Sequence, residues 1–261
     1  MNPQANPYAR VADELSRSRF GSIAYCAETE STNADAAALL GDPHAFGRTI
    51  VAEHQTRGRG RKGRTWVSQP GASLMATTIL PMVLDAARIW VVPFWTGLAV
   101  RRALLSHGIP TTLQWPNDVL IPGTGKLAGI LCVSRITGAE AWTACGIGIN
   151  VRRPPGGTAA PIEPPPAYCD DVVAVDRAAL LLSLLREYDR TLHELDDAGA
   201  VTRAWEEAAR IPGAAYRLVR DAGNAAFSAA ALALADGGGL VVRLADGTTE
   251  TIALADVRAL R

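Results

Sequence analysis

Two long apolar segments near the middle of the chain are joined by a short connection that is typical of a turn. Leu127–Arg135 and Ala139–Val151 flank Ile136-Thr137-Gly138, and this pattern predicts a β-hairpin. Helix-like and strand-like segments alternate around the hairpin. The chain therefore cannot be all-helical, and the expected fold class is α+β, with a mixed β-sheet and helices.

The remaining elements are predicted from apolar periodicity and from the residues that end each segment. Helices are expected at Asn33–Leu40, where Ser31 or Thr32 caps the first turn, and at Arg88–His107, Asp176–Leu195 and Val201–Arg210. Strands are expected at 22–26, Thr49–Glu53, Ser73–Leu80 (ended by Pro81) and Thr111–Trp115. Residues 1–20 are expected to form a loose leader with one helical turn, and 152–170 a proline-rich loop.

The last 50 residues differ in pattern from the rest of the chain. Short alternating segments are expected as strands at Tyr216–Arg220, Ala226–Ala233, Gly239–Leu244 and Thr248–Ala253. Asp-Gly pairs at 236–237 and 246–247 are strong hairpin signals. We therefore predict two domains: a large α+β domain over 1–210, which holds the candidate catalytic motifs, and a small domain of the β-barrel type over 211–261.

Charge and cysteine content exclude several classes of protein. The chain of 261 residues carries 26 basic and 26 acidic residues, so it is not built as a whole to coat nucleic acid or an anionic membrane. Its four cysteines include no C-x-x-C pair, and Cys132 and Cys145 are expected to pack as small apolar residues. The longest apolar segment, Ile89–Val100, is too short to cross a bilayer. A cytoplasmic protein without a membrane partner is predicted.

A basic, glycine-rich segment is the strongest candidate for chemistry. Five cations lie between residues 57 and 64, interleaved with three glycines and followed by Trp66. Arginine forks and exposed backbone N–H groups suit a phosphate or an acyl phosphate, and an indole can stack on a base. The string Gly58–Gly63 also matches G-x-G-x-x-G, but no helix follows it, so a dinucleotide-binding turn is rejected. A nucleic-acid patch and a solvated basic loop are the alternatives.

Three further motifs are ambiguous when each is taken alone. Lys126 stands at the start of an apolar strand, but Leu127 and Leu120 rule out a phosphate-binding P-loop. Asn117 and Asp118 follow Trp115-Pro116, where they either build a turn or offer oxygen ligands to Mg²⁺ beside a nucleotide. Glu30-Ser31-Thr32-Asn33 is by itself an ordinary helix cap.

In their order along the chain, these motifs resemble the biotin protein ligase family. The matching segments are Ser31-Thr32-Asn33, Gln55 with Gly58-Arg59-Gly60-Arg61 and Gly63-Arg64-x-Trp66, Trp115-Pro116-Asn117-Asp118, Lys126–Leu131 and Gly146-Ile147-Gly148-Ile149-Asn150. The resemblance implies a catalytic domain similar to that of class II synthetases, followed by an SH3-like domain. It also implies ATP-dependent formation of biotinyl-5′-AMP and transfer of biotin to a lysine of a biotin carboxyl carrier domain of acyl-CoA carboxylases.

The resemblance also implies a role for each matching residue. Biotin would be bound by Ser31, Thr32, Asn33, Gln55, Arg59, Gly60, Arg61 and Lys126, and ATP or the adenylate by Arg59, Arg61, Trp66, Asn117, Lys126 and Asn150. Lys126 and Arg61 would be the catalytic residues and Asp118 the ligand of Mg²⁺. No protein nucleophile is required, because the carboxylate of biotin attacks the α-phosphorus of ATP directly.

Two features determine how closely the chain follows the pattern of this family. Many members have lysine where this chain has Gln114, which removes a cation near the nucleotide. The Ser31-Thr32-Asn33 motif begins too early for an N-terminal helix-turn-helix, so the short form without DNA binding is expected. The alternative activity is that of a lipoate or octanoate protein ligase, which shares the fold; Gln55 and the Gly-Arg segment favour biotin.

Overall fold

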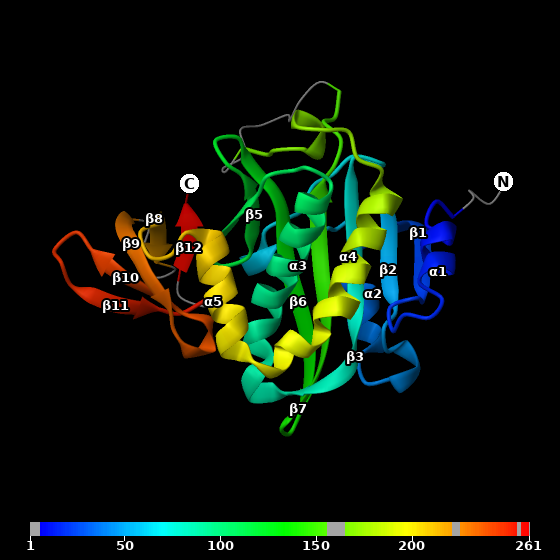
Figure 1. The fold of residues 1–261 in the computed structure, drawn as a ribbon, viewed down its shortest axis with the longest axis horizontal. Helices are drawn as coiled ribbons and strands as arrows, with labels where there is room; N and C mark the ends of the chain where they lie inside the picture. The colour runs from blue at the N-terminus through cyan, green and yellow to red at the C-terminus, as the bar shows by residue number, and fades with distance from the viewer. Residues whose placement is uncertain (1–5, 156–164, 221–224, 255–256, 261) are drawn as a thin grey trace.

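A seven-stranded sheet forms the centre of the protein in a computed structural model that describes residues 6–155, 165–220, 225–254 and 257–260 (Figure 1). Its strand order is β1-β2-β3-β7-β6-β5-β4. The strands are β1 Ile23–Thr29, β2 Thr49–Gln55, β3 Ser73–Asp85, β4 Thr112–Gln114, β5 Asp118–Ile121, β6 Gly125–Thr137 and β7 Glu140–Asn150. β1 runs parallel to β2 while the other pairs are antiparallel, so the predicted mixed sheet and the α+β class are confirmed.

The predicted hairpin is the pair β6–β7 at the centre of the sheet. Cys132 lies opposite Cys145 in this pair. The neighbouring Cys145 thiol, together with burial, raises the pKa of the Cys132 thiol well above its usual range. The Cys132 side chain is therefore held as a thiol. Cys145 is buried in the larger core and Cys132 packs against that core, so both behave as small apolar residues, as predicted.

The expectation that Pro81 ends its strand is wrong. β3 continues through Pro81 to Asp85, and its register against β7 shifts between Ile79 and Val83. A proline has no N–H to give to a neighbouring strand, so a bulge is a position where it is tolerated inside a sheet.

Helices cover both faces of this sheet (Figure 1). α2 Thr32–Leu39 packs on one face, where Ala36 and Leu40 meet Ile79 and Ala144 in a small core. The larger core lies on the other face beneath α3 Val92–Ser106 and α4 Arg177–Thr191, which are joined by the stacked rings of Trp95 and Tyr188, 4.8 Å apart. The segment Ala86–Val91 before α3, of which the part from Arg88 onward was expected as helix, forms a 3-10 turn.

The N-terminal segment is more ordered than the predicted leader. α1 Ala9–Glu14 is a short helix, and Tyr8, Val11, Leu15 and Phe20 are all buried in the larger core. Their burial removes apolar area from water and ties the start of the described chain to α4.

The C-terminal segment forms a second, antiparallel sheet after α5 Ala198–Ala209 (Figure 1). Its strands are β8 Ala215–Arg220, β9 Ala226–Leu234, β10 Leu240–Leu244, β11 Thr249–Ile252 and β12 Val257–Leu260, the last of which was not predicted. The order β11-β10-β9-β8-β12 is open in the described pairings, so a closed barrel is not confirmed. The sheet starts just after residue 210, where we propose the boundary between the domains 1–210 and 211–261.

Trp115 joins the two sheets. Its indole Nε1 donates to the carbonyl of Gly238 at 3.0 Å, and its backbone N–H donates to the Tyr216 hydroxyl at 3.0 Å. Trp115 is completely buried, so these bonds satisfy polar groups that water does not reach. In the described part of the chain, none of the helices has the length and apolar character needed to span a membrane.

Candidate functional site

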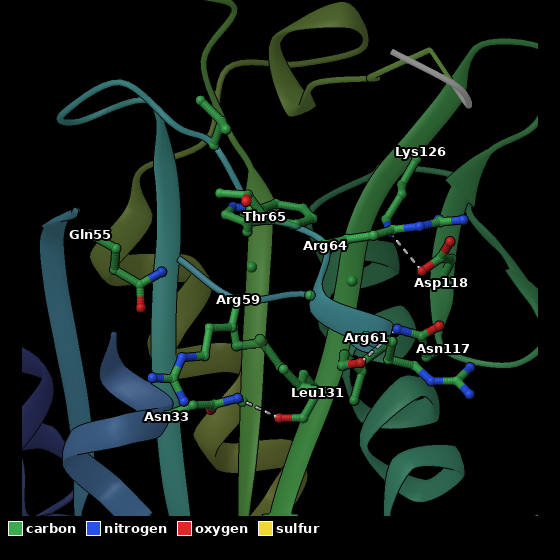
Figure 2. Close-up of a pocket in the computed structure, with 18 of the residues that line it drawn as sticks. Asn33, Gln55, Arg59, Arg61, Arg64, Thr65, Asn117, Asp118, Lys126 and Leu131 are labelled. Atoms are coloured by element: carbon green, nitrogen blue, oxygen red, sulfur yellow. Dashed lines mark hydrogen bonds and ion pairs between the residues drawn. The ribbon is translucent and has the colours of Figure 1, made fainter. Parts of the chain in front are cut away.

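A cavity of about 390 Å³ lies on the face of the central sheet that carries α2 (Figure 2). Gly129 faces Gly148 and Leu131 faces Gly146 across β6 and β7. Alternate residues of a strand point to the same face, so three of these four positions are glycines on the cavity side. Their missing side chains leave the space that the cavity occupies.

The structure brings all the residues proposed from the sequence into this one cavity. The lining includes Ser31, Thr32, Asn33, Gln55, Arg59, Gly60, Arg61, Trp66, Asn117, Asp118, Lys126 and Asn150. They come from α2, from the ends of β2 and β7, from the segment after β2, and from β5 and β6. Residues more than 100 positions apart in the sequence thus share one site.

One end of the cavity, the neutral end, is built from uncharged polar side chains that bind one another, and the exposed Arg59 reaches toward it from the basic segment (Figure 2). Gln55 Oε1 accepts hydrogen bonds from the backbone N–H of Thr32 at 2.8 Å and from its hydroxyl at 3.0 Å. A backbone N–H can only donate, so this contact fixes the Gln55 amide with its oxygen toward Thr32 and its Nε2 on the other side. Nε2 has a single weak partner among the described residues, Met75 Sδ at 3.4 Å. Gln55 therefore offers an N–H donor to a ligand.

Ser31 stands at the N-cap position of α2, but its side chain makes no capping hydrogen bond. The expectation that Ser31 or Thr32 caps this helix is confirmed in position, since Ser31 is the N-cap residue and Thr32 the first residue of the helix, but only the Ser31 carbonyl bonds the first turn. Ser31 is 2% exposed and lines the cavity. Its hydroxyl is thus placed for a ligand rather than for the helix.

Asn33 connects the floor of the cavity to the central strands. Its Nδ2 donates to the carbonyl of Leu131 at 2.9 Å, and its Oδ1 lies 2.7 Å from the Thr77 hydroxyl (Figure 2). A Cβ on Gly146 would come within 2.0 Å of Asn33 Oδ1. Asn33 therefore holds α2 against β6 and β7, a structural role beside any contact with a ligand.

The other end of the cavity is charged. Lys126 Nζ forms an ion pair with Asp118 Oδ1 at 2.8 Å, seen as a dashed line in Figure 2. Lys126 Nζ also lies 5.6 Å from the centre of the Trp66 ring. Both charged side chains are largely buried, so each stabilises the charge of its partner while no ligand is bound.

Trp66 lies flat against the two glycines of the floor. A Cβ on Gly148 would approach Trp66 Cε2 within 2.6 Å, and one on Gly129 would approach Cζ3 within 3.2 Å. Its indole Nε1 is buried and has no hydrogen-bond partner among the described residues. An unpaired buried donor of this kind is costly, so a ligand that accepts from it gains binding free energy.

The basic segment closes one side of the cavity. Gly60 N–H donates to the Arg64 carbonyl at 2.7 Å, and Arg61–Gly63 forms a 3-10 turn in which Lys62 has a φ of 55°. Arg61 extends to the second sheet, where its Nη2 donates to the carbonyl of Leu254 at 2.7 Å. The segment thus lies between the cavity and the C-terminal sheet, and Arg59 on it is exposed.

Asn117 and Asn150 bind backbone groups. Asn117 Nδ2 donates to the carbonyl of Ile130 at 2.7 Å, and Asn150 Nδ2 donates to that of Ala167 at 3.1 Å. Both side chains therefore fix the backbone that surrounds the cavity, and their ATP-binding roles stay predictions.

The proline-rich loop contributes lining residues that the sequence did not indicate. Pro166 and Tyr168 line the cavity. The backbone N–H of Lys126 donates to the Pro165 carbonyl at 2.8 Å, and that of Ala167 donates to the Lys126 carbonyl at 2.8 Å. The only signal for this strand-like pairing was Tyr168 itself, an aromatic residue within a run of prolines.

The described residues contain no group of three or more His, Cys, Asp or Glu side chains that could hold a metal ion. Asp118 is the carboxylate that lines the cavity. One carboxylate is a common protein contribution to Mg²⁺ when a nucleotide supplies further oxygen ligands. A single carboxylate at this position is compatible with Mg²⁺ that a phosphate-bearing ligand brings with it.

Comparisons with known proteins all find protein ligases. The model of the biotin/lipoate A/B protein ligase family matches residues 25–150. A biotin--[acetyl-CoA-carboxylase] ligase of Paracoccus denitrificans is 36% identical over 69% of this chain and 77% of its own length. Another, from Mycobacterium tuberculosis, is 36% identical over 62% of this chain and 61% of its own length.

Solved structures show the same fold. A biotin protein ligase from Aquifex aeolicus, in complex with biotin and ATP, has a TM-score of 0.69 at 24% identity and covers 92% of this chain and 98% of its own. A biotin protein ligase from Leishmania major, in complex with biotinyl-5-AMP, has a TM-score of 0.56 at 23% identity. The similarity includes the C-terminal sheet, because it extends over nearly all of the chain.

Proposed function

Because this chain belongs to the biotin protein ligase family, we propose that it activates biotin with ATP and transfers the biotinyl group to a protein lysine. The observation that carries this proposal is the division of one cavity into an end walled by uncharged polar side chains and an end that holds the Lys126–Asp118 ion pair (Figure 2). A ligand with an uncharged polar head and a carboxylate tail matches that division.

The neutral end is proposed to hold the ureido head of biotin. A ureido group presents one carbonyl acceptor and two N–H donors, so its site has to offer both kinds of partner. Gln55 Nε2 supplies a donor, and the hydroxyls of Ser31 and Thr32 supply acceptors. Lipoate carries a dithiolane ring without N–H or carbonyl groups, and it would leave these buried groups unpaired. This arrangement favours biotin over the lipoate or octanoate alternative.

The charged end is proposed to hold the carboxylate of biotin and the α-phosphate of ATP. A carboxylate oxygen attacks the α-phosphorus, a P–O bond to pyrophosphate breaks, and biotinyl-5′-AMP is left. Negative charge builds on the phosphate oxygens, and Lys126 is in position to stabilise it, with Arg61 as its partner. Lys126 has to leave Asp118 in order to bind the phosphate. The ion pair therefore holds the Lys126 ammonium group in the cavity until the phosphate replaces Asp118 as its partner.

Asp118 would be the protein ligand of Mg²⁺, which enters with ATP and, when bound, screens the phosphate charge. Release of Asp118 from Lys126 frees the carboxylate at the moment when Lys126 turns to the phosphate. Trp66 would stack beside the adenine, with Asn117 and Asn150 fixing the surrounding backbone.

The segment Arg59–Arg61 would cover the adenylate and exclude water from the mixed anhydride. In the second step, the ε-amine of an acceptor lysine attacks the acyl carbon, AMP leaves, and an amide is formed. The proposed acceptor is a biotin carboxyl carrier domain, in keeping with the acetyl-CoA carboxylase named for the relatives.

The test is transfer to a purified carrier domain with ATP and Mg²⁺, followed by intact mass, with lipoate in a parallel reaction. We expect a gain of one biotinyl group that requires ATP and is absent with lipoate. A gain with lipoate and none with biotin would overturn the substrate assignment. No adenylate and no gain with either acid would overturn the ligase activity.

A further inference from the structure

Thr77 lies directly beneath the neutral end of the cavity without lining it. It is in the middle of β3, is 0% exposed, and is absent from the cavity wall. Its hydroxyl lies 2.8 Å from Thr32 Oγ1 and 2.7 Å from Asn33 Oδ1. No motif in the sequence indicated this residue.

The hydrogens of this cluster can be counted. Three oxygen–oxygen contacts join Thr32 to Gln55, Thr32 to Thr77 and Thr77 to Asn33, but only two hydroxyl hydrogens are present. Gln55 Oε1 can only accept, and Thr32 is its donor through both its backbone N–H and its hydroxyl. Asn33 Oδ1 is an acceptor only, and Thr77 is the donor that the described contacts give it. The Thr32 hydroxyl therefore donates to Gln55 Oε1, and the Thr77 hydroxyl is the donor toward Thr32 Oγ1 and Asn33 Oδ1.

This arrangement determines what Thr32 can offer to a ligand. With its own hydrogen donated to Gln55 Oε1 and the Thr77 hydroxyl donating to it from β3, Thr32 Oγ1 keeps a lone pair for the cavity side. Gln55, fixed by the Thr32 backbone, presents an N–H. The two residues then form one acceptor and one donor side by side, which complements an –NH–C(=O)– edge of a ligand.

We propose that Thr77 is a positioning residue that selects a urea or amide head group by fixing the proton arrangement of Thr32 and Gln55. This inference rests on the proposed function, since it assumes that biotin occupies the cavity. Thr77→Val leaves Asn33 Oδ1 without its donor. It also removes the hydroxyl that donates to Thr32 Oγ1, so Thr32 loses the contact that holds its side chain in place beside Gln55.

A matched control lies next to Thr77 on the same strand. Thr78 is 2% exposed, and its hydroxyl meets only Thr49 Oγ1, at 3.0 Å, in the described contacts. Successive residues of a strand point to opposite faces, so Thr78 faces away from Thr32. Thr78→Val is an equally buried, identical change that leaves the cavity cluster intact.

The experiment measures KM and kcat of adenylate formation for biotin, desthiobiotin and ATP in the wild type, Thr77→Val, Thr77→Ser and Thr78→Val. In Thr77→Val we expect the KM for biotin and for desthiobiotin, which keeps the urea, to rise by about 10- to 100-fold. The KM for ATP and kcat stay within about twofold, because the charged end is untouched. Thr77→Ser restores the wild-type KM, and Thr78→Val leaves it unchanged.

The outcomes separate this inference from the proposed function. An inactive wild-type protein would contradict the proposed function itself. An active wild type whose KM for biotin is unchanged in Thr77→Val would overturn the role of Thr77. Equal losses in Thr77→Val and Thr78→Val, or a loss for biotin without one for desthiobiotin, would also overturn it. Thermal unfolding of both valine variants shows whether the folded fraction accounts for any loss of kcat.

Discussion

The two ends of the cavity are built on different principles. At the neutral end, Thr32 and Gln55 satisfy each other through short hydrogen bonds and are held by the ends of α2 and β2. At the charged end, Lys126 and Asp118 form an ion pair across two strands, and Arg61 donates a hydrogen bond to the carbonyl of Leu254. The neutral groups can accept a ligand without giving up their contacts, whereas the charged groups have to exchange partners.

This difference assigns separate tasks to the two ends. Fixed dipoles in a buried site give specificity, because a ligand that fails to match leaves polar groups unpaired. Charges that change partner respond to the charge that develops during the reaction. Variants at the neutral end should therefore change affinity for the acid, and variants at the charged end should change the rate of its activation.

Removal of Mg²⁺ is expected to have the largest effect. With EDTA present, pyrophosphate release should fall to background, because Lys126 and Arg61 alone do not balance the charge of a polyphosphate. Biotin binding measured by calorimetry should be unchanged, since the neutral end uses no metal. Adenylate formation at an undiminished rate in EDTA would show that the charged end works without a metal.

Lys126→Met should lower the rate of adenylate formation by about 100- to 1,000-fold, the range for loss of one charge-stabilising group at a reacting centre. Pyrophosphate release with saturating biotin and ATP measures it. Lys62→Met is the comparison, because Lys62 and Lys126 are the two lysines of the chain and Lys62 is exposed at the rim of the same cavity. We expect Lys62→Met to lower the rate of adenylate formation by less than about fivefold, because exposed charges contribute little. Equal losses would remove the distinction between Lys126 and the basic segment.

Gly146→Ala should damage the floor of the neutral end. Its Cβ would lie 2.0 Å from Asn33 Oδ1 and 2.6 Å from the Leu131 carbonyl, so Asn33 has to leave its position. We expect the free energy of unfolding to fall by about 1–3 kcal/mol, as for overpacked cores, together with weaker biotin binding. Denaturant unfolding and calorimetry measure both quantities.

Gly97→Ala in α3 is the matched control for that change. Its nearest neighbour would be Trp205 Nε1 at 3.5 Å, an ordinary contact, and alanine favours the helix. The free energy of unfolding should stay equal or rise. A stable Gly146→Ala with full biotin affinity would contradict the role given to Asn33.

Ser31→Ala is expected to have the smallest effect, and one confined to affinity. Biotin should bind about tenfold more weakly, the cost of one hydrogen bond, with little change in stability, because Ser31 makes no capping bond. Asp176→Ala should do the opposite: Asp176 accepts from Ala179 N–H at the start of α4, so stability falls by about 1 kcal/mol while biotin binding is kept. Melting curves and calorimetry on both variants decide between a ligand contact and a cap at Ser31.

The sequence predicted the central hairpin, most helices and many residues of the cavity, because each of these is encoded within a short segment. Ser31, Gln55 and Lys126 could be proposed from local motifs, and the sheet then brings those motifs together. Tyr8, Val11 and Leu15 follow helical spacing, so the packing of α1 could have been found from the same kind of pattern.

Contacts between distant segments could not be predicted in this way. The Lys126–Asp118 pair depends on a register shift between β5 and β6, and the Arg61–Leu254 contact joins residues 193 positions apart. The Thr77 cluster depends on the position of α2 over β3, which no local pattern specifies. Pro81 was misjudged because a bulge, not the end of a strand, accommodates it.

The most direct test of the two-ended cavity is a crystal structure with biotin and a non-hydrolysable ATP analogue bound. The account predicts the ureido group against Ser31, Thr32 and Gln55, and the carboxylate and α-phosphate at Lys126, with the Lys126–Asp118 ion pair broken. A ligand bound in the reverse direction, or bound with that ion pair intact, would contradict the division of the cavity into a selecting end and an activating end.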